Sequence, residues 1–228
     1  MKKNLLVAGA LLSSVFALSG CQFGLDFRDQ NQDVVSYDVT DKVTALEVES
    51  GSGDIVINES DRSGIHVTET VHWRGKRPAT EHNVDGGRLT LRYACDDPSC
   101  SVDYKVEVPR GLTAKLDTGS GTITLRGLSG KVDAVSGSGD VDAGDLRARR
   151  FVADTGSGEI EARFRGTPDH VEIESGSGDA TAYLPKGSYD VTAETGSGDR
   201  TIEVTDDPSA PRKVTVKTGS GNVGVLIG

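Results

Sequence analysis

The sequence contains one tryptophan, four histidines and, after its first residues, no long apolar run. A polysaccharide-cleaving β-helix would need aromatic sugar platforms beside an acid cluster and a basic catalytic residue, and Trp73 alone does not provide them. A serine hydrolase would need a histidine partner and a Gly-x-Ser-x-Gly turn, whereas the repeated Gly-Ser-Gly serines of this chain outnumber its histidines. These shortages argue against both enzyme classes, so no catalytic residues are predicted.

Basic residues are also in deficit, with 25 Lys and Arg against 35 Asp and Glu and a net charge of −10. Removing residues 1–20 would remove Lys2 and Lys3 and no acid, which leaves 23 basic and 35 acidic residues, or −12. Phosphate binding depends on clustered Lys and Arg. We therefore expect no nucleic-acid partner.

The N-terminal segment has the pattern of an export signal. A short basic start precedes an apolar run from Leu5 to Leu18, and Leu18-Ser19-Gly20-Cys21 follows. A bilayer-spanning helix needs about 20 apolar residues, and this run is shorter and ends at a processing-like site. The alternative is an ordinary secretory signal with a chance cysteine.

The Leu-x-Gly-Cys ending resembles the lipobox of bacterial lipoproteins. The resemblance implies that the Cys21 thiol carries a lipid such as palmitate and becomes the new N-terminus. It also implies an exported protein on the extracytoplasmic face of the bacterial membrane or envelope. The lipid would be its membrane anchor, and more than one acyl chain makes such an anchor stable.

Two cysteines then remain, Cys95 and Cys100. Disulfides persist outside the cytoplasm, so this pair is predicted to form a disulfide that pins a tight turn between two strands. The short loop would contribute about 2 kcal/mol of stability. A metal site is the alternative, but no third or fourth soft ligand lies nearby in the sequence.

One motif dominates the rest of the chain. Gly-Ser-Gly occurs seven times, each time after Ser or Thr, and the copies begin at Gly51, Gly119, Gly137, Gly156, Gly176, Gly196 and Gly219. The central serines of the last six copies are 18, 19, 20, 20 and 23 residues apart. A fixed period of this length is the signature of a repeat architecture.

Apolar and polar residues alternate on both sides of the motif, as in Val171 and Ile173 before it or Ile160 and Ala162 after it. Such alternation predicts strands with one buried face. An antiparallel hairpin array is the alternative, but it gives no reason for the same motif at every second turn. Stacked coils do, because identical positions then lie about 4.8 Å apart. The predicted fold is all-β: a parallel β-solenoid, or β-helix, of about 20-residue coils.

The solenoid core should be narrow in its middle, where alanine takes the inward positions 134, 143, 153, 162, 180, 182 and 193. Arg200 also falls on an inward position, so its strand is either shifted by one residue or lies at an edge. Stacking in chain order would place Gly176 and Gly178 in the middle. It would place Gly219 and Gly221 in the last coil, where substitution should cost less because fewer neighbours are disturbed.

Residues 58–113 interrupt the motif with longer alternating runs. They are predicted to form a cap, since the exposed strand edge at the N-terminal end of a solenoid has to be covered. The expected organisation is a signal peptide at residues 1–20, a tether at 21–33 and a solenoid domain at 34–228 that includes this cap.

The repeated (Ser/Thr)-Gly-Ser-Gly-(Asp/Glu)-(Ile/Val), with Leu89-Thr90-Leu91 and the segment from Val106 to Leu112, resembles the putative adhesin family, domain of unknown function 4097. The resemblance covers roughly residues 40–228. It implies a β-strand-repeat fold in an envelope-associated protein without established catalytic residues.

The residues after the motif are mostly acidic and would stack at one corner of the solenoid: Asp54, Asp140, Glu159, Asp179 and Asp199. Carboxylates suit Ca²⁺, and Gly-Gly-x-Gly-x-Asp repeats bind it between coils. This turn is one residue shorter, however, and Thr122 and Asn222 interrupt the row. We therefore predict a solvated acidic face without metal or cofactor, with a calcium site as the alternative.

Together these features predict a membrane-anchored, surface-exposed and non-catalytic β-solenoid lipoprotein. It would act as an adhesin-like or scaffold module that binds an envelope protein or a surface glycan. The alternatives are a calcium-stabilised structural spacer and a polysaccharide-active β-helix enzyme.

Overall fold

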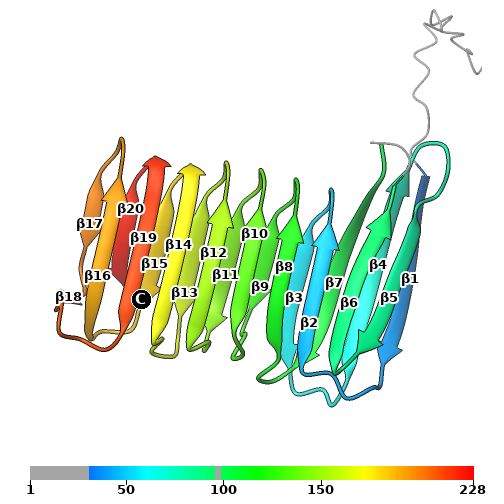
Figure 1. Ribbon diagram of the computed structural model, residues 1–228, viewed down its shortest axis with the longest axis horizontal. Coiled ribbons are helices and arrows are strands. Elements are labelled where there is room, and N and C mark those ends of the chain that lie inside the picture. The colour runs from blue at the N-terminus through cyan, green and yellow to red at the C-terminus, as the bar shows by residue number, and fades with distance from the viewer. Residues whose placement is uncertain (1–30, 96–98) are drawn as a thin grey trace, which may run out of the picture.

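The computed structural model describes residues 31–95 and 99–228, in which two ten-stranded sheets face each other along one rod (Figure 1). The signal peptide, Cys21 and most of the expected tether lie outside the described residues. Each coil contributes one strand to each sheet. The Gly-Ser-Gly turns follow one another along one long edge of the rod, and the second turns follow the opposite edge (Figure 1).

Both sheets are built from strands that are distant in sequence. Sheet A contains, in spatial order, β1 (Asn31–Val39), β4 (Ile65–Trp73), β7 (Ser101–Pro109), β3 (Ile55–Ser60), β9 (Ile123–Arg126), β11 (Val141–Leu146), β13 (Ile160–Phe164), β15 (Ala180–Leu184), β20 (Val223–Ile227) and β17 (Arg200–Ile202). Sheet B contains β18 (Thr205–Asp206), β16 (Ser188–Thr195), β19 (Lys213–Ser220), β14 (His170–Ser177), β12 (Arg150–Thr155), β10 (Val132–Ser136), β8 (Thr113–Thr118), β2 (Ala45–Ser50), β6 (Arg88–Ala94) and β5 (Ala79–Asp85).

Most of the strand pairs are parallel and in register, for example β10–β12 and β13–β15. The antiparallel pairs β1–β4, β4–β7 and β5–β6 lie at the N-terminal end. The predicted parallel β-solenoid is therefore confirmed. Residues 58–113 contain β4 to β7, of which β6 and β7 continue the parallel stack while β4 and β5 extend it with antiparallel strands.

The core lies between the sheets and is narrow, as the inward alanines predicted. Those from Ala134 to Ala182 are at most 1% exposed, and Ala193 is 6% exposed. Phe151 and Phe164 fill the space beside them, in edge-to-face contact with ring centroids 5.8 Å apart. Large and small side chains thus alternate across the thin core, which keeps it densely packed.

A row of buried hydroxyl groups runs beneath the Gly-Ser-Gly turns. The Ser or Thr before each motif donates a hydrogen bond to a backbone carbonyl of the adjacent coil, as Thr155 Oγ1 does to Gly139 O at 2.9 Å and Ser175 Oγ to Gly158 O at 2.9 Å. The equivalent bonds start from Thr118, Ser136, Thr195 and Thr218. These bonds satisfy polar groups that would otherwise be buried without a partner.

The coils do not stack in chain order, so that prediction was wrong. The last coil in sequence, β19–β20, lies between β14–β15 and β16–β17. At the other end, β2–β3 lies between β6–β7 and β8–β9. The outermost coil, β16–β17, therefore precedes its inner neighbour, β19–β20, in the sequence. The long connection from β17 to β19 spans the distance between them. The wider spacing of 23 residues between Ser197 and Ser220 was the sequence signal for this step.

Arg200 lies on an edge strand with its register intact. Strand β17 ends sheet A, and Arg200 pairs with Val223 of β20 at the position where other coils carry inward apolar residues. Its side chain is exposed, and Nη1 donates to the Ala193 carbonyl at 3.4 Å. An arginine is tolerated there because no further coil covers it.

The N-terminal end is closed by aromatic side chains from both sheets. Tyr37 of β1 stacks on His82 of β5 with ring centroids 4.5 Å apart, and the Tyr37 hydroxyl donates to Glu69 Oε1 at 2.7 Å. Glu69 is 1% exposed, and burial is the largest cause of the raised pKa of Tyr37. Strand β1 begins at Asn31, whereas the tether expected from sequence ran to residue 33. The first six residues of this edge strand are exposed, so β1 lacks the alternation that marks the other strands.

Candidate binding surface

The outermost parallel coil has a disulfide turn where the other coils have Gly-Ser-Gly. Cys95 and Cys100 are joined by a disulfide between β6 and β7, with Cα atoms 6.3 Å apart. Beside it, the Tyr93 hydroxyl accepts the Ser52 N–H at 2.7 Å and donates to Ser52 O at 2.9 Å. These bonds attach the first Gly-Ser-Gly turn to the end coil.

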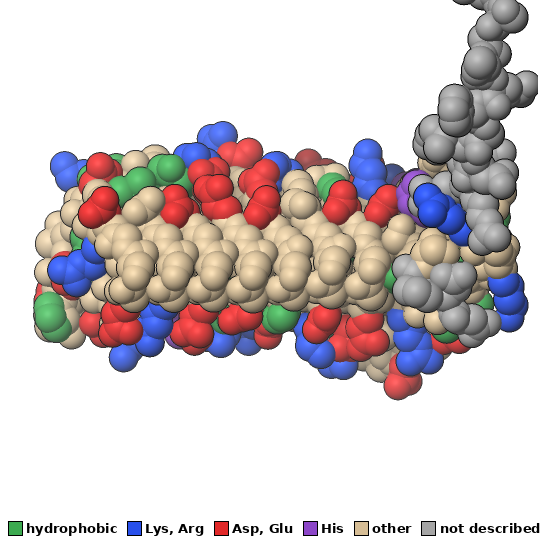
Figure 2. Space-filling model, turned by 90° about the horizontal axis from the view of Figure 1, so that it is seen from above, with side chains coloured by type: hydrophobic (Ala, Val, Ile, Leu, Met, Phe, Trp, Pro, Cys, Tyr) green, Lys and Arg blue, Asp and Glu red, His purple; other side chains and the backbone are tan. Residues whose placement is uncertain are grey.

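The central serines form an exposed ridge along the turn edge, visible as the smooth band along the rod in Figure 2. Histidine side chains bond elsewhere: His66 to Asp38 at 2.9 Å, His72 to Asp103 at 3.1 Å and His170 to Glu172 at 3.4 Å. The remaining one, His82, stacks on Tyr37. In the described chain none of these histidine contacts involves a serine of the Gly-Ser-Gly motif.

The acidic residues after the motif lie in one row beside this ridge, as expected. Their carboxylates accept backbone N–H groups of the next coil: Asp54 Oδ1 from Thr122 at 2.9 Å, Asp140 Oδ1 from Glu159 at 2.8 Å and Asp179 Oδ1 from Asn222 at 2.7 Å. Asn222 Oδ1 accepts the Asp199 N–H at 3.0 Å in turn. The carboxylates of Asp54, Asp140 and Asp179 thus join neighbouring coils through direct hydrogen bonds.

Electrostatic repulsion along this row is visible at Glu159. Its pKa is raised, first by partial burial and then by the charges of Asp179, Glu161 and Asp140. Within residues 31–95 and 99–228, no three or more His, Cys, Asp or Glu side chains are grouped to hold a metal ion. The calcium candidates lie in a row but are not assembled into a coordination site.

We expect removal of calcium by a chelator to leave the melting temperature unchanged, because the Asp179 carboxylate is already engaged with the Asn222 N–H. Asp179→Asn keeps an acceptor oxygen for this N–H and removes one charge next to Glu159, but it loses the acceptor for Asn222 Nδ2 at 3.2 Å, so stability should change little. Asp179→Ala removes the acceptor and should lower stability by about 1 kcal/mol. Thermal melts with EDTA and with millimolar Ca²⁺ provide the measurement. A calcium-dependent shift above about 10 °C would contradict the prediction, since a bound ion stabilises by mass action.

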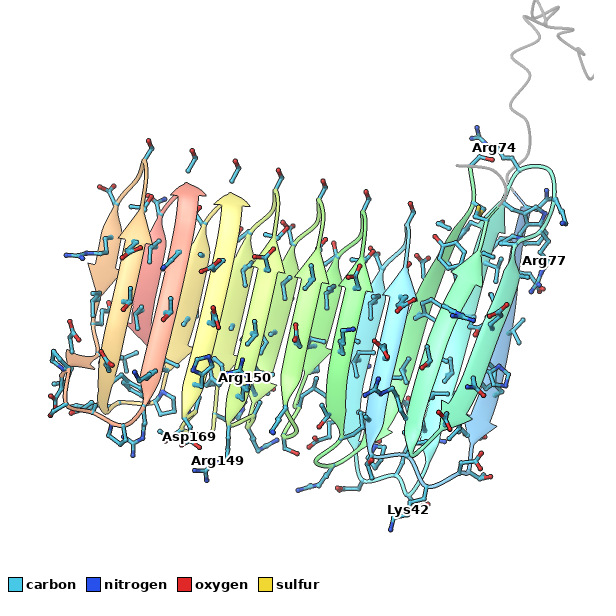
Figure 3. All side chains as sticks on the ribbon, viewed as in Figure 1. Lys42, Arg74, Arg77, Arg149, Arg150 and Asp169 are labelled. Carbon is cyan, nitrogen blue, oxygen red and sulfur yellow. A yellow bond between two sulfur atoms is a disulfide. The ribbon has the colours of Figure 1, made fainter. Side chains whose placement is uncertain are left out.

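The outer face of sheet B contains a hollow of about 240 Å³ near the second-turn edge. Its floor is formed at Ala45 and Thr113, short residues at adjacent positions on β2 and β8. Four cations surround the floor: Arg88, Lys115, Lys131 and Arg150. Two short side chains in a row of long ones leave this depression, because neighbouring strands lie only about 4.8 Å apart. Figure 3 shows Arg150 at the start of β12, above the Arg149–Asp169 pair.

The cations of the hollow differ in how they are paired. Glu47, whose side chain is only 14% exposed, binds Lys115 Nζ at 2.7 Å and Arg88 Nη1 at 3.2 Å. The hydrogen bond from Lys115 is the main cause of the lowered pKa of Glu47. In the described chain neither Lys131 nor Arg150 has a hydrogen bond or ion pair from its side chain. Two positive charges at the hollow are thus available to a ligand.

The arginines on the middle strands of sheet A are engaged within the protein. Arg126 forms an ion pair with Asp142 that also has a contact from Nη1 to Asp142 O at 2.9 Å. Arg163 pairs with Glu161 at 2.7 Å, and its guanidinium carbon lies 3.7 Å from the ring centroid of Tyr183. Sheet B therefore has the stronger candidate for binding an external group.

Sequence reasoning did not find the hollow. Its cations come from β6, β8 and the starts of β10 and β12, which belong to consecutive coils of the chain, but the earlier strand β2 lies between β6 and β8 in the sheet. The register supplies the missing information: Ala45 pairs with both Arg88 and Thr113, and Lys131 precedes Val132, which pairs with Ala114 and Phe151. An alignment of the repeat units on Gly-Ser-Gly would have brought Lys131 and Arg150 close but not Arg88, whose coil lacks the motif.

A family model described as Toastrack DUF4097 matches residues 99–226. The crystal structure of a "putative cell adhesion protein" from Clostridium sporogenes matches with a TM-score of 0.53 and 13% identity, over 88% of this chain and 100% of that one. A "putative adhesin" from Bacteroides fragilis matches with a TM-score of 0.43 and 12% identity, over 85% of this chain and 97% of that one.

A "putative lipid binding protein" from Parabacteroides distasonis matches with a TM-score of 0.33 and 13% identity, over 86% of this chain and 97% of that one. No curated protein matches the chain. At these identities the Clostridium structure supports the fold alone.

Proposed function

Because the chain belongs to the Toastrack DUF4097 family, we propose that it is a lipid-anchored, non-catalytic solenoid that binds a component of the cell envelope or an external surface. Membership of this family confirms the resemblance drawn from the repeated motif. Adhesion, the function named for the similar solved structures, is for this chain part of the proposal.

The position of β1 is the observation that carries the proposal. The described chain begins at Asn31 on the outermost strand of sheet A, and both sheets extend away from that end (Figure 1). Nine residues lie between Cys21 and Asn31, and the ten residue steps that join the two can span at most about 36 Å when extended. A lipid on Cys21 would keep the N-terminal end near the bilayer and leave both outer faces accessible.

Solenoids use extended outer faces for binding because each coil adds one more row of side chains to the same surface. Here those faces are rigid, since each inner strand is hydrogen-bonded on both sides and its inward residues are buried. Residues 31–95 and 99–228 include no helix that is long and apolar enough to cross a membrane.

Cys21→Ser should move the protein from the membrane fraction to the soluble exported fraction, because one thiol would carry the whole anchor. Cell fractionation followed by immunoblotting measures the shift. The matched control is Cys100→Ser, which removes the other partner of the Cys95–Cys100 disulfide and should leave the protein in the membrane fraction. If the Cys21→Ser variant stays in the membrane pellet, the lipid anchor is rejected.

A further inference from the structure

We propose that the hollow on sheet B binds the carboxylate of an acidic sugar in a narrow anionic glycan chain. The inference rests on the proposed surface-binding function and names its ligand class. It starts from the charge balance of the hollow. The charged lining residues are four cations, Arg88, Lys115, Lys131 and Arg150, and two acids, Glu47 and Asp133. The net charge of the lining is therefore +2. The chain as a whole has a net charge of −10. The positive charge at the hollow is therefore opposite in sign to the charge of the whole chain.

The two cations without partners define where the ligand charge sits. Glu47 already engages Arg88 and Lys115, which leaves Lys131 and Arg150 on the other side of the floor. An arginine fork binds a carboxylate through two parallel hydrogen bonds, and lysine adds a point charge. One ligand carboxylate placed between Arg150 and Lys131 would form ion pairs with both side chains, which have no acidic partner in the described chain.

The floor of the hollow suits a sugar ring attached to that carboxylate. Ala45 and Thr113 present a methyl group and a small side chain with one hydroxyl, so the floor combines apolar contact with hydrogen bonding. The volume of about 240 Å³ is smaller than a typical drug-sized pocket, which holds roughly 300–1,000 Å³. It accommodates one compact group and is open on the face of the sheet for the chain to continue.

The arrangement of charges on sheet B selects a narrow partner. Across the strands, Arg150 is followed by His170 and then Lys213. These two side chains already pair with Glu172 at 3.4 Å and with Asp190 at 3.8 Å, so the unpaired positive charge is confined to the hollow. Nearer the turn edge, the same face carries an acidic row with Glu49 beside Asp117 and Asp154 beside Glu174. A flat anionic bilayer or a double-stranded nucleic acid would meet this acidic row and be repelled. A single glycan strand can place one carboxylate in the hollow without covering the acidic row.

The test is isothermal titration calorimetry on the full chain in neutral detergent. The probes are a galacturonic acid trimer, the uncharged galactose trimer, inorganic phosphate and vesicles containing phosphatidylglycerol. We expect the acidic trimer to bind, with an affinity that falls as salt is raised. The galactose trimer, phosphate and vesicles should give no comparable signal. Equal binding of both trimers would overturn the carboxylate assignment, and preferential binding of phosphate or vesicles would overturn the glycan assignment.

Lys131→Ala and Arg150→Ala should each weaken binding of the acidic trimer at least about tenfold, as expected for loss of a charged hydrogen-bond donor. The matched control is Lys186→Ala, which removes the same charge from an exposed residue that does not line the hollow. Circular dichroism confirms that each variant is folded, and these exposed side chains support no core contact. An equal loss in the Lys186→Ala variant would show that net charge alone drives binding and would overturn the site.

Failure of this inference is distinguishable from failure of the proposed function. A wild-type protein that remains in the membrane fraction but binds none of the probes rejects the anionic glycan and keeps the lipid-anchored module. A protein that binds the acidic trimer but is found in the soluble fraction rejects the anchor and keeps the site.

Discussion

Gly178→Ala and Gly221→Ala are each expected to destabilise the protein by at least about 3 kcal/mol, through backbone strain combined with overpacking. Gly178 has φ +138°, and a Cβ there would lie 2.1 Å from Gly158 O of the adjacent coil. Gly221 has φ +141°, and its Cβ would lie 2.3 Å from Gly178 O. Gly221 is near the C-terminus in sequence but in the interior of the stack, so neither coil can move away. Urea unfolding followed by circular dichroism gives the free energies.

Substitutions at two further glycines distinguish overpacking against the adjacent coil from backbone strain as the cause of the lost stability. A Cβ on Gly198 would also clash, at 2.1 Å from Gly221 O, but its coil is the outermost at the C-terminal end. That coil can shift outward, so Gly198→Ala should cost less. Gly111 has φ +77° and nothing within 4 Å of the added Cβ, so Gly111→Ala should cost only about 1 kcal/mol of backbone strain. A small cost at Gly221, similar to that at Gly111, would contradict the stacking order.

Phe151→Ala is expected to destabilise the protein by about 3–5 kcal/mol, the cost of emptying a large buried site. Phe151 is fully buried, and its ring contacts Phe164 edge to face. The in-register neighbours Val132 and Val171 are held by the sheet, and the nearby Ala134 and Ala153 are too small to fill the space. Continuous hydrogen-bonded sheets on both sides also prevent the core from collapsing into it. Urea unfolding of the variant measures the loss.

The control for this prediction is Val152→Ala on the same strand. Val152 points to the outer face of sheet B and is partly exposed, so its truncation should cost less than about 1 kcal/mol. Similar costs at Phe151 and Val152 would mean that the two faces of β12 are equally buried, in conflict with a two-sheet core.

Local features of the sequence were sufficient for the strands and their faces. Alternation in segments such as the one from Arg150 to Thr155 predicts one buried side, and the structure shows that pattern. The recurrence of Gly-Ser-Gly predicts parallel stacking, because only stacked coils bring equivalent glycines against each other. A Cβ on Gly137 would lie 2.5 Å from Gly119 O of the next coil, which explains the repeated absence of a side chain.

The row of acidic residues after the Gly-Ser-Gly motifs was only partly predictable from the sequence. Its position was predictable from the residue after each motif. The hydrogen bond from the Asn222 N–H to Asp179 Oδ1 was not, because it joins residues 43 positions apart in coils that are not successive in the order assumed. Such bonds occupy carboxylate oxygens that the sequence alone left open to calcium.

What the sequence determined by itself is the repeat unit: strand length, buried face, turn composition and parallel pairing all follow from residues within about 20 positions of one another. What only the tertiary structure decided is which units become neighbours at the two ends. The coil β19–β20 inserts beneath β16–β17, and β2–β3 inserts beneath β6–β7. The physical reason is that equivalent coils present nearly the same edge to one another, so local patterns do not distinguish one stacking order from another. The contacts that do, such as Tyr37 against Glu69 and the Asn222 N–H against Asp179, form between distant segments. The hollow on sheet B is a product of that order, since β2 lies between β6 and β8 and places the short residue Ala45 beside Thr113, between Arg88 and the cations Lys131 and Arg150.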